Sequence, residues 1–176
     1  MLKDNIRFVR LTPDNQQTSF DCGDKDLNEF LTRDAIDYQN SLLAVTYLVK
    51  EGDVTIGYVS IANDKISIHD SNKSGWRRIK KSFNHSKHRA DYPAVKIGRL
   101  AVDKDYQDKD IGTIIIDFIK CSFIDDNRTG CTFVTVDALR SALPFYIKNK
   151  FKFLDDSQLN VDSHTVLLYY NLTELI

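Results

Sequence analysis

The sequence predicts an α/β fold with one dominant sheet. Short runs of β-branched and aromatic residues alternate with longer segments whose apolar residues recur at three- and four-residue steps. A chain of 176 residues that is 42% hydrophobic also suits one compact domain with a substantial core. We therefore expect a single domain over residues 1–176, with a basic helical insertion at about 65–92.

The first part of the chain indicates a strand, a helix and a hairpin. Residues 6–11 form a β-like run. A helix with one apolar stripe follows, with Asp24 or Asp26 as its cap. Residues 44–50 and 54–62 read as two strands joined by a glycine-containing turn.

The second part of the chain alternates strands and helices. The helix after residue 110 carries a stripe of isoleucines, and the later short helix has Pro144, which suits a first turn. The predicted elements are strand 93–103, a helix from about 111 to 125, strand 131–138, helix 141–151 and strand 164–172.

Composition argues against several classes of protein. A formal net charge of −1 provides no global attraction to nucleic acid or membranes, and no apolar stretch approaches the length of a membrane span. The N-terminus lacks the features of a signal peptide. Cys22, Cys121 and Cys131 form no CxxC pair, and the four histidines show no metal-ligand spacing. We expect a cytoplasmic protein without a metal.

The junction "RLAVDKDYQDKDIGT" (99–113) joins a buried strand to a helix through a polar turn. The first amides of a helix lack intrahelical acceptors, and they lie at the positive end of the helix dipole, so a helix start can bind an anion. In α/β folds ligands favour the carboxyl edge of the sheet. With Gly112 as its only glycine, the turn by itself also fits an ordinary strand–helix connection.

The same junction resembles the acyl-CoA signature of the GNAT N-acetyltransferase superfamily. Gln107 and Gly112 match the first and last positions of the family's Q/R-x-x-G-x-G/A turn. The resemblance implies a GNAT-like fold with a central mixed, largely antiparallel sheet flanked by helices. It also implies an N-acetyltransferase that moves acetyl from acetyl-CoA to an amine. The cofactor-binding residues that it implies are Leu100, Ala101, Val102, Gln107, Asp108, Lys109, Asp110, Ile111, Gly112 and Thr113.

The resemblance extends to "FVTVDALRSALPFYIKNKFKF" (133–153) and implies Tyr146 as the catalytic proton donor to the leaving thiolate. Three positions depart from the family pattern. Asp110 replaces the middle glycine of the turn, Leu139 stands where many relatives carry an asparagine, and Lys150 replaces the glycine before Phe151. These departures predict weaker or altered cofactor binding.

The segment 65–92 is strongly basic, with eight Lys or Arg residues against two Asp residues. Trp76, Ile79 and Phe83 fall at helical spacing, so an amphipathic helix with a cationic face is predicted. Such a face can be a solvated surface or a contact for a phosphate backbone. The candidate acceptor-binding residues are Arg77, Arg78, Lys80 and Lys81.

Within the superfamily, "FDCGDKDLNEFLTRDA" (20–35) and "GRLAVD" (98–103) resemble the toxin-type branch. Those toxins acetylate aminoacyl-tRNA and are restrained by a ribbon-helix-helix antitoxin. The resemblance therefore implies tRNA and such an antitoxin as partners, and it leaves a homodimer open. The first interpretation is an N-acetyltransferase whose amine acceptor the sequence does not name. The toxin that acetylates aminoacyl-tRNA is one alternative, and a non-catalytic module that binds RNA or a partner is the other.

Overall fold

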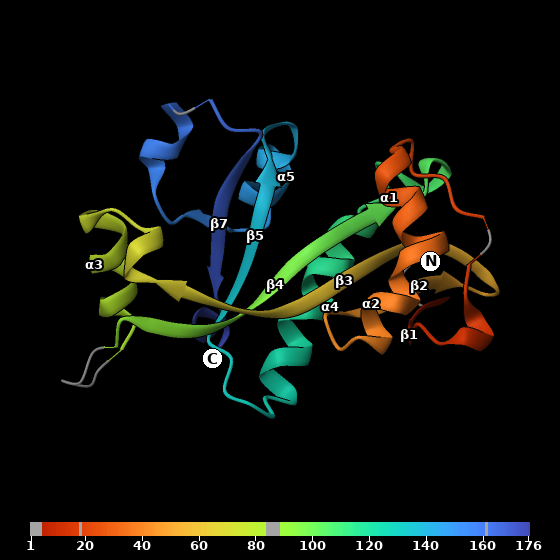
Figure 1. Cartoon of the computed structure of the whole chain (residues 1–176), viewed down its shortest axis with the longest axis horizontal. Coiled ribbons are helices and arrows are strands. Elements are labelled where there is room, and N and C mark those ends of the chain that lie inside the picture. Colours follow the sequence, from red (N-terminus) through yellow and green to blue (C-terminus); the bar gives the residue numbers. More distant parts are fainter. Residues whose placement is uncertain (1–4, 18, 84–88, 161) are drawn as a thin grey trace. The chain divides into compact units, whose positions relative to one another are not determined.

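A sheet with the strand order β1-β2-β3-β4-β5-β7-β6 organises the chain (Figure 1). The computed structural model describes residues 5–17, 19–83, 89–160 and 162–176. The strands are β1 (Ile6–Arg10), β2 (Val45–Glu51), β3 (Val54–Ser67), β4 (Asp91–Val102), β5 (Phe133–Leu139), β6 (Lys152–Phe153) and β7 (Thr165–Asn171). The pairs β1–β2, β2–β3, β5–β7 and β6–β7 are antiparallel. The predicted mixed α/β fold is confirmed.

The helices follow the order that the sequence predicts. They are α1 (Lys25–Glu29), α2 (Ala35–Asn40), α3 (Lys73–Lys81), α4 (Ile111–Asp125) and α5 (Leu143–Lys148). A π-helical turn, Phe30–Asp34, joins α1 to α2. Of the two expected caps, Asp24 is the one used, because its carboxylate accepts a hydrogen bond from Leu27 N at 3.0 Å.

Contacts divide the chain into two compact units. The first contains Met1–Ala62 and Ile97–Ile119, and the second contains Asn63–Lys96 and Lys120–Ile176. The strands β3 and β4 and the helix α4 contribute residues to both units.

In the first unit, α1, the π-helical turn and α2 cover one face of the strands. Phe30 and Leu31 pack with Leu48 and Tyr58 in a buried cluster. The Tyr58 hydroxyl donates a hydrogen bond to Leu27 O at 2.8 Å, which ties β3 to α1. On β1, Phe8 stacks on Phe118 of α4 with ring centroids 3.8 Å apart. Apolar packing therefore fixes both the helical segment and α4 to the strands.

In the second unit, β5 and β7 run side by side (Figure 1). The helix α3 packs on a cluster of buried residues that includes several aromatic rings. Trp76 and Ile79 are buried there with Phe133 and Leu154. Gly75 allows this close approach, because a Cβ at that position would lie 1.9 Å from the Leu154 carbonyl oxygen. The predicted amphipathic helix in the basic segment is therefore confirmed.

Several elements differ from the sequence prediction. The strand expected at 54–62 continues to Ser67, so part of the expected insertion belongs to the sheet. The short helix expected at 141–151 is a 3-10 turn, Arg140–Ala142, followed by α5. Strand β6 was not predicted, because two residues are too short for a hydrophobic period to show. His85, Lys87 and His88 of the basic segment lie outside the described residues.

Candidate active site

The junction between β4 and α4 is built by hydrogen bonds around Asp103. Asp103 N donates to Ile56 O at 2.9 Å, which continues the pairing with β3. The Asp103 carboxylate accepts from Asp105 N at 3.0 Å and begins a 3-10 turn, Lys104–Tyr106. The following residues, 107–110, are exposed. The turn therefore presents its backbone to solvent directly before the first turn of α4.

Gln107, the first position of the acyl-CoA signature, braces this turn. Its Nε2 donates to Val102 O at 3.0 Å and to Cys22 O at 2.9 Å. A second link lies nearby, because Lys104 Nζ contacts Asp21 Oδ2 at 2.7 Å. The hydrogen bond from Lys104, followed by those from Gly23 N and Asn28, lowers the pKa of Asp21 to about 2. The segment before α1 thus supports the turn.

Two non-glycine residues of the turn have left-handed backbone conformations. The φ angle is 60° at Asp108 and 59° at Asp110. Asp110 occupies the position where the signature has glycine, and the positive φ explains that preference, because glycine adopts it without steric cost. Aspartate is among the non-glycine residues that tolerate it best. The Asp110 carbonyl accepts from Ile114 N at 3.1 Å and so starts the ladder of α4.

The charged side chains around the turn offer little attraction to an anion, so anion binding there depends on backbone N–H groups. Lys104 is paired with Asp21. Lys109 Nζ donates to Asp105 O at 2.7 Å and lies 4.8 Å from the Tyr106 ring centroid. The side chains of Asp108 and Asp110 add negative charge. The amides at the start of α4 are therefore the main positive groups that the junction offers to a pyrophosphate.

On β4, the residues expected to line the thioester alternate in burial. Ala101 is buried and packs in the cluster of Tyr58, whereas Leu100 and Val102 are partly exposed. Gly57 of β3 permits a close approach to this strand, because a Cβ there would lie 2.8 Å from Ala101 O. The strand β4 therefore packs closely against β3 up to its last residues, directly before the turn.

Tyr146, the expected catalytic residue, lies on α5 with 7% of its surface exposed. Its ring packs edge-to-face on Phe145 and Phe151, with centroids 5.0 and 5.4 Å away. Burial raises the pKa of Tyr146 to about 12, so the hydroxyl stays protonated at neutral pH. No hydrogen bond joins this hydroxyl to a residue that the structure describes. The proton is therefore available for donation.

The buried residue Lys120, which the sequence did not indicate as functional, stabilises the end of the helix α5 that carries Tyr146. Lys120 is 6% exposed, and its Nζ donates to Asn149 O at 3.0 Å and lies 3.8 Å from the Tyr170 ring centroid. Asn149 in turn donates through Nδ2 to Phe145 O at 2.9 Å. Lys150 has a φ of 70°, which explains why the family pattern has glycine there.

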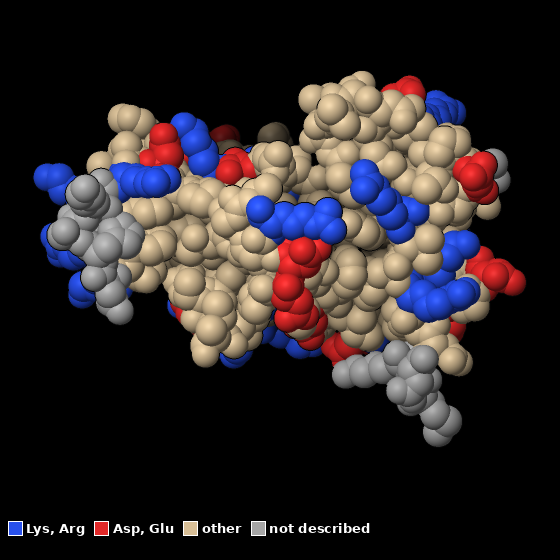
Figure 2. Space-filling view, turned by 90° about the horizontal axis from the view of Figure 1, so that it is seen from below, with Lys and Arg blue, Asp and Glu red and all other residues tan. Residues whose placement is uncertain are grey.

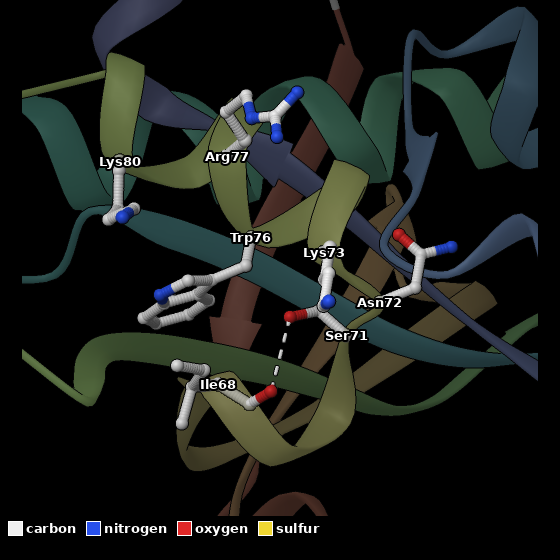
Figure 3. Close-up of a pocket in the computed structure, with 7 residues that line it drawn as sticks. All are labelled: Ile68, Ser71, Asn72, Lys73, Trp76, Arg77 and Lys80. Atoms are coloured by element: carbon white, nitrogen blue, oxygen red, sulfur yellow. Dashed lines mark hydrogen bonds between the residues drawn. The ribbon is translucent and has the colours of Figure 1, made fainter.

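The helix α3 places its cations in two groups. Lys73, Arg77 and Lys80 line a hollow of about 380 Å³ together with Ile68 and Trp76, with Ser71 and Asn72 completing the lining. Figure 3 shows Ile68 and Lys80 beside the indole of Trp76, and the Arg77 guanidinium pointing away from the indole.

The second group, Arg78 and Lys81, does not line the hollow. Arg78 donates to Phe153 O at 2.9 Å and to Ser74 Oγ at 3.2 Å, and Lys81 is not among the residues that line the hollow. Of the four expected acceptor-binding residues, the hollow therefore brings together Arg77 and Lys80. It also includes Lys73. The sequence could have indicated this residue, because positions 73, 77 and 80 follow the three- and four-residue spacing of one helix face.

The described residues indicate neither a metal site nor a membrane-spanning helix. They hold no group of three or more His, Cys, Asp or Glu side chains that could bind a metal ion. None of their helices has the length and apolarity needed to cross a membrane. On the face drawn in Figure 2, acidic and basic side chains are interspersed.

Comparison with known proteins agrees with this arrangement. A family model described as the acetyltransferase (GNAT) domain matches residues 73–166. The chain belongs to the GNAT acetyltransferase family. This GNAT enzyme is an N-acetyltransferase that takes the acetyl group from acetyl-CoA.

Solved structures of other GNAT proteins share the fold. A tyrosine-to-phenylalanine mutant of KacT has a TM-score of 0.77 at 22% identity, with 98% of this chain and 99% of that chain covered. AtaTR bound with acetyl-CoA has a TM-score of 0.75 at 22% identity, covering 98% and 96%. The AtaT mutant toxin bound to the C-terminus of the antitoxin AtaR and acetyl-CoA has 0.71 at 20%, covering 98% and 96%. At these identities the likeness supports the fold.

Proposed function

We propose that this GNAT enzyme acetylates the amino group of aminoacyl-tRNA. The observation that carries the proposal is the α3 hollow, which Lys73, Arg77 and Lys80 line together with Trp76 and Ile68. Clustered cations beside an aromatic side chain are typical of surfaces that bind a phosphate backbone. Because the formal net charge of the chain is −1, attraction to a phosphate backbone must come from such a local cluster and not from the overall charge.

The assigned residues divide the work of the reaction. Backbone amides of Lys109 to Thr113 bind the pyrophosphate of the cosubstrate, and backbone N–H groups of Leu100 to Val102 stabilise the negative charge that develops on the carbonyl oxygen. The thioester supplies an activated acetyl group. As the amine nitrogen bonds to the carbonyl carbon and the carbon–sulfur bond breaks, Tyr146 donates its proton to the departing sulfur. The amine loses a proton to solvent.

The role of Tyr146 is tested by the variant Tyr146→Phe. We expect kcat to fall on the order of 100-fold, because one general acid contributes about that much. The affinity for acetyl-CoA should stay the same, since the ring and its packing are retained. The matched control is Tyr169→Phe, another buried tyrosine, which packs on Phe133.

The pH profile adds a second readout for Tyr146. Because burial raises its pKa to about 12, the hydroxyl should produce no basic limb in kcat at ordinary assay pH. Unchanged single-turnover rates in Tyr146→Phe would remove this residue from the mechanism.

The acceptor is tested by transfer of labelled acetyl from acetyl-CoA to bulk aminoacyl-tRNA. Labelled, base-labile product is expected on aminoacyl-tRNA and not on deacylated tRNA. The competing acceptor is a small polyamine or a peptide amine. Turnover on those amines with none on aminoacyl-tRNA would contradict the proposed acceptor and leave the N-acetyltransferase activity intact.

We also propose that the enzyme acts in the cytoplasm as the toxin of a toxin–antitoxin pair, with a ribbon-helix-helix antitoxin as partner and a homodimer as its assembly. The support is the likeness to the AtaT toxin, whose structure was determined with the C-terminus of AtaR. A small ribbon-helix-helix protein encoded next to this gene should co-purify with the enzyme and suppress its toxicity. A monomeric mass in light scattering would contradict the proposed homodimer and leave the proposed toxin role unaffected.

A further inference from the structure

Arg99 of β4 lies against two aromatic rings on the face that the helical segment covers. Its Cζ is 3.9 Å from the ring centroid of Phe30 and 5.7 Å from that of Tyr38. The two rings meet edge-to-face with centroids 5.3 Å apart. An arginine at this distance from an aromatic face is held by a cation–π interaction.

The aromatic ring nearest to Arg99 is packed into a buried cluster of the first unit. Phe30 is 2% exposed, packs beside Tyr58 and is the first residue of the π-helical turn, where its carbonyl accepts from Ala35 N. Turns of this kind are rare within helices and are frequent at functional sites. The wide turn places Phe30 and Tyr38 on the same side of the helical segment, where both reach Arg99.

The polar edge of Arg99 is unused by the described residues. The side chain is only partly exposed, yet none of those residues accepts a hydrogen bond from its guanidinium or forms an ion pair with it. A guanidinium has five N–H donors. Arg140 shows the alternative, because its Nε, Nη1 and Nη2 donate to three backbone carbonyls and hold a loop.

The position of Arg99 on β4 connects it to the chemistry. Side chains of a strand alternate, so Arg99 shares its face with Ala101, which packs in the same cluster as Phe30. Leu100, the neighbour of Arg99, is the first strand residue assigned to the thioester. A molecule that reaches β4 from the face of α1 and α2 therefore meets the guanidinium one residue away from the assigned backbone groups.

We propose that Arg99 binds an oxyanion of the amine acceptor, a phosphate or a carboxylate close to the reacting amino group. The contact with the Phe30 ring holds the guanidinium in place and leaves its N–H groups for two oxygens of one group. This assignment rests on the proposed N-acetyltransferase reaction of this site. It makes Arg99 a specificity-determining residue that favours amines carrying such a group over bare amines.

The kinetic test compares acceptors that differ in the anion. Arg99→Met should raise KM for an anionic acceptor about 10- to 100-fold, the range for lost hydrogen bonds to a charged group, and leave KM for acetyl-CoA unchanged. Arg99→Lys should restore only part of this loss, because an ammonium has no planar fork. The matched control is Arg33→Met, an exposed arginine of the π-helical turn that pairs with Glu29.

A binding test separates this inference from the proposed reaction. The Nε–H signal of Arg99 is observed by NMR in the full chain, assigned by its loss in Arg99→Lys, and titrated with single-stranded RNA, glycylglycine and glycinamide. We expect a shift with an oxyanion-bearing probe and none with glycinamide. A shift with RNA alone identifies phosphate as the source, and one with glycylglycine alone identifies carboxylate.

A signal that neither RNA nor glycylglycine moves, or that glycinamide moves equally, would overturn the assignment of Arg99. Absence of acetyl transfer from the wild-type enzyme to any amine would instead overturn the proposed function. The NMR titration still decides the role of Arg99 in that case, because it needs no turnover.

Discussion

The turn before α4 and the helix α3 are two candidate anion sites that use different chemical groups. The turn carries Asp108 and Asp110 and has its lysines engaged, so it offers an anion the backbone amides of a helix start. The helix α3 offers side-chain cations around an apolar wall. Backbone donors have fixed positions and suit one anion of defined geometry, whereas flexible cations suit a polymer with repeated charges.

This difference makes different predictions for salt. Binding to α3 should release counterions from a nucleic acid and weaken steeply as salt rises. Binding to the turn involves one small ligand and short-range hydrogen bonds, so it should respond less to salt. Substitutions in one region should therefore leave the ligand of the other region unaffected.

The largest effect is expected from Gly112→Glu. The new carboxylate would stand at the start of α4 beside the bound pyrophosphate and repel it, and we expect acetyl-CoA affinity to fall on the order of 100-fold or more. Calorimetry measures this loss, with Gly112→Ala as the neutral control. Retained tRNA binding in Gly112→Glu would show that the variant is folded. Unchanged acetyl-CoA affinity would mean that the turn is not the pyrophosphate site.

A smaller, salt-dependent effect is expected from replacing Lys73, Arg77 and Lys80 together with Ser. If each contacts one phosphate, the slope of log affinity for tRNA against log salt should flatten by roughly 2 to 3 units. Acetyl-CoA affinity should not change. Arg78→Ser with Lys81→Ser is the matched control, because it removes two charges of the same helix that do not line the hollow.

Equal losses of tRNA affinity in the triple variant and in its control would contradict a defined site on α3. They would instead indicate a diffuse attraction to the whole cationic helix. No loss in either variant would mean that the cations of α3 are an ordinary solvated surface, and it would remove the main support for tRNA as the acceptor.

Local pattern predicted the element order, the cap at Asp24 or Asp26 and the buried stripe of α3. Such features repeat within one turn of helix or one strand, so they are visible in a short window of sequence. The signature at Gln107 and Gly112 also marked the junction. What it could not show is that the Gln107 side chain braces the turn by reaching Cys22 O, a residue far away in the sequence.

The features that escaped prediction depend on long-range contacts. Lys120 is a polar residue in an apolar helix, and only the folded chain shows its carbonyl partner and the ring of Tyr170. Arg77 and Arg78 cannot be distinguished in the sequence. In the fold, Arg78 donates a hydrogen bond to Phe153 O, 75 residues away. The sequence places Arg99 in a strand, and nothing in its sequence neighbours reveals that Phe30 lies against it.

The smallest effect is expected from Asp110→Gly, which makes the turn resemble the family signature. Removing the carboxylate relieves a repulsion of about 1 kcal/mol toward the pyrophosphate, so acetyl-CoA should bind about 5-fold more tightly. Glycine also adopts the φ of 59° without strain, although its greater freedom in the unfolded chain offsets part of that gain in stability.

Asp110→Asn separates the two causes, because asparagine tolerates the left-handed conformation and carries no charge. If charge controls affinity, Asp110→Asn should match Asp110→Gly in calorimetry, and Asp108→Asn reports the effect of a neighbouring carboxylate in the same turn. Tighter binding in Asp110→Gly alone would assign the effect to the backbone. Weaker binding in both Asp110 variants would show that this carboxylate supports the turn. The aspartate would then be a functional part of the acidic turn, which distinguishes this turn from the basic helix α3, and not merely the loss of a glycine.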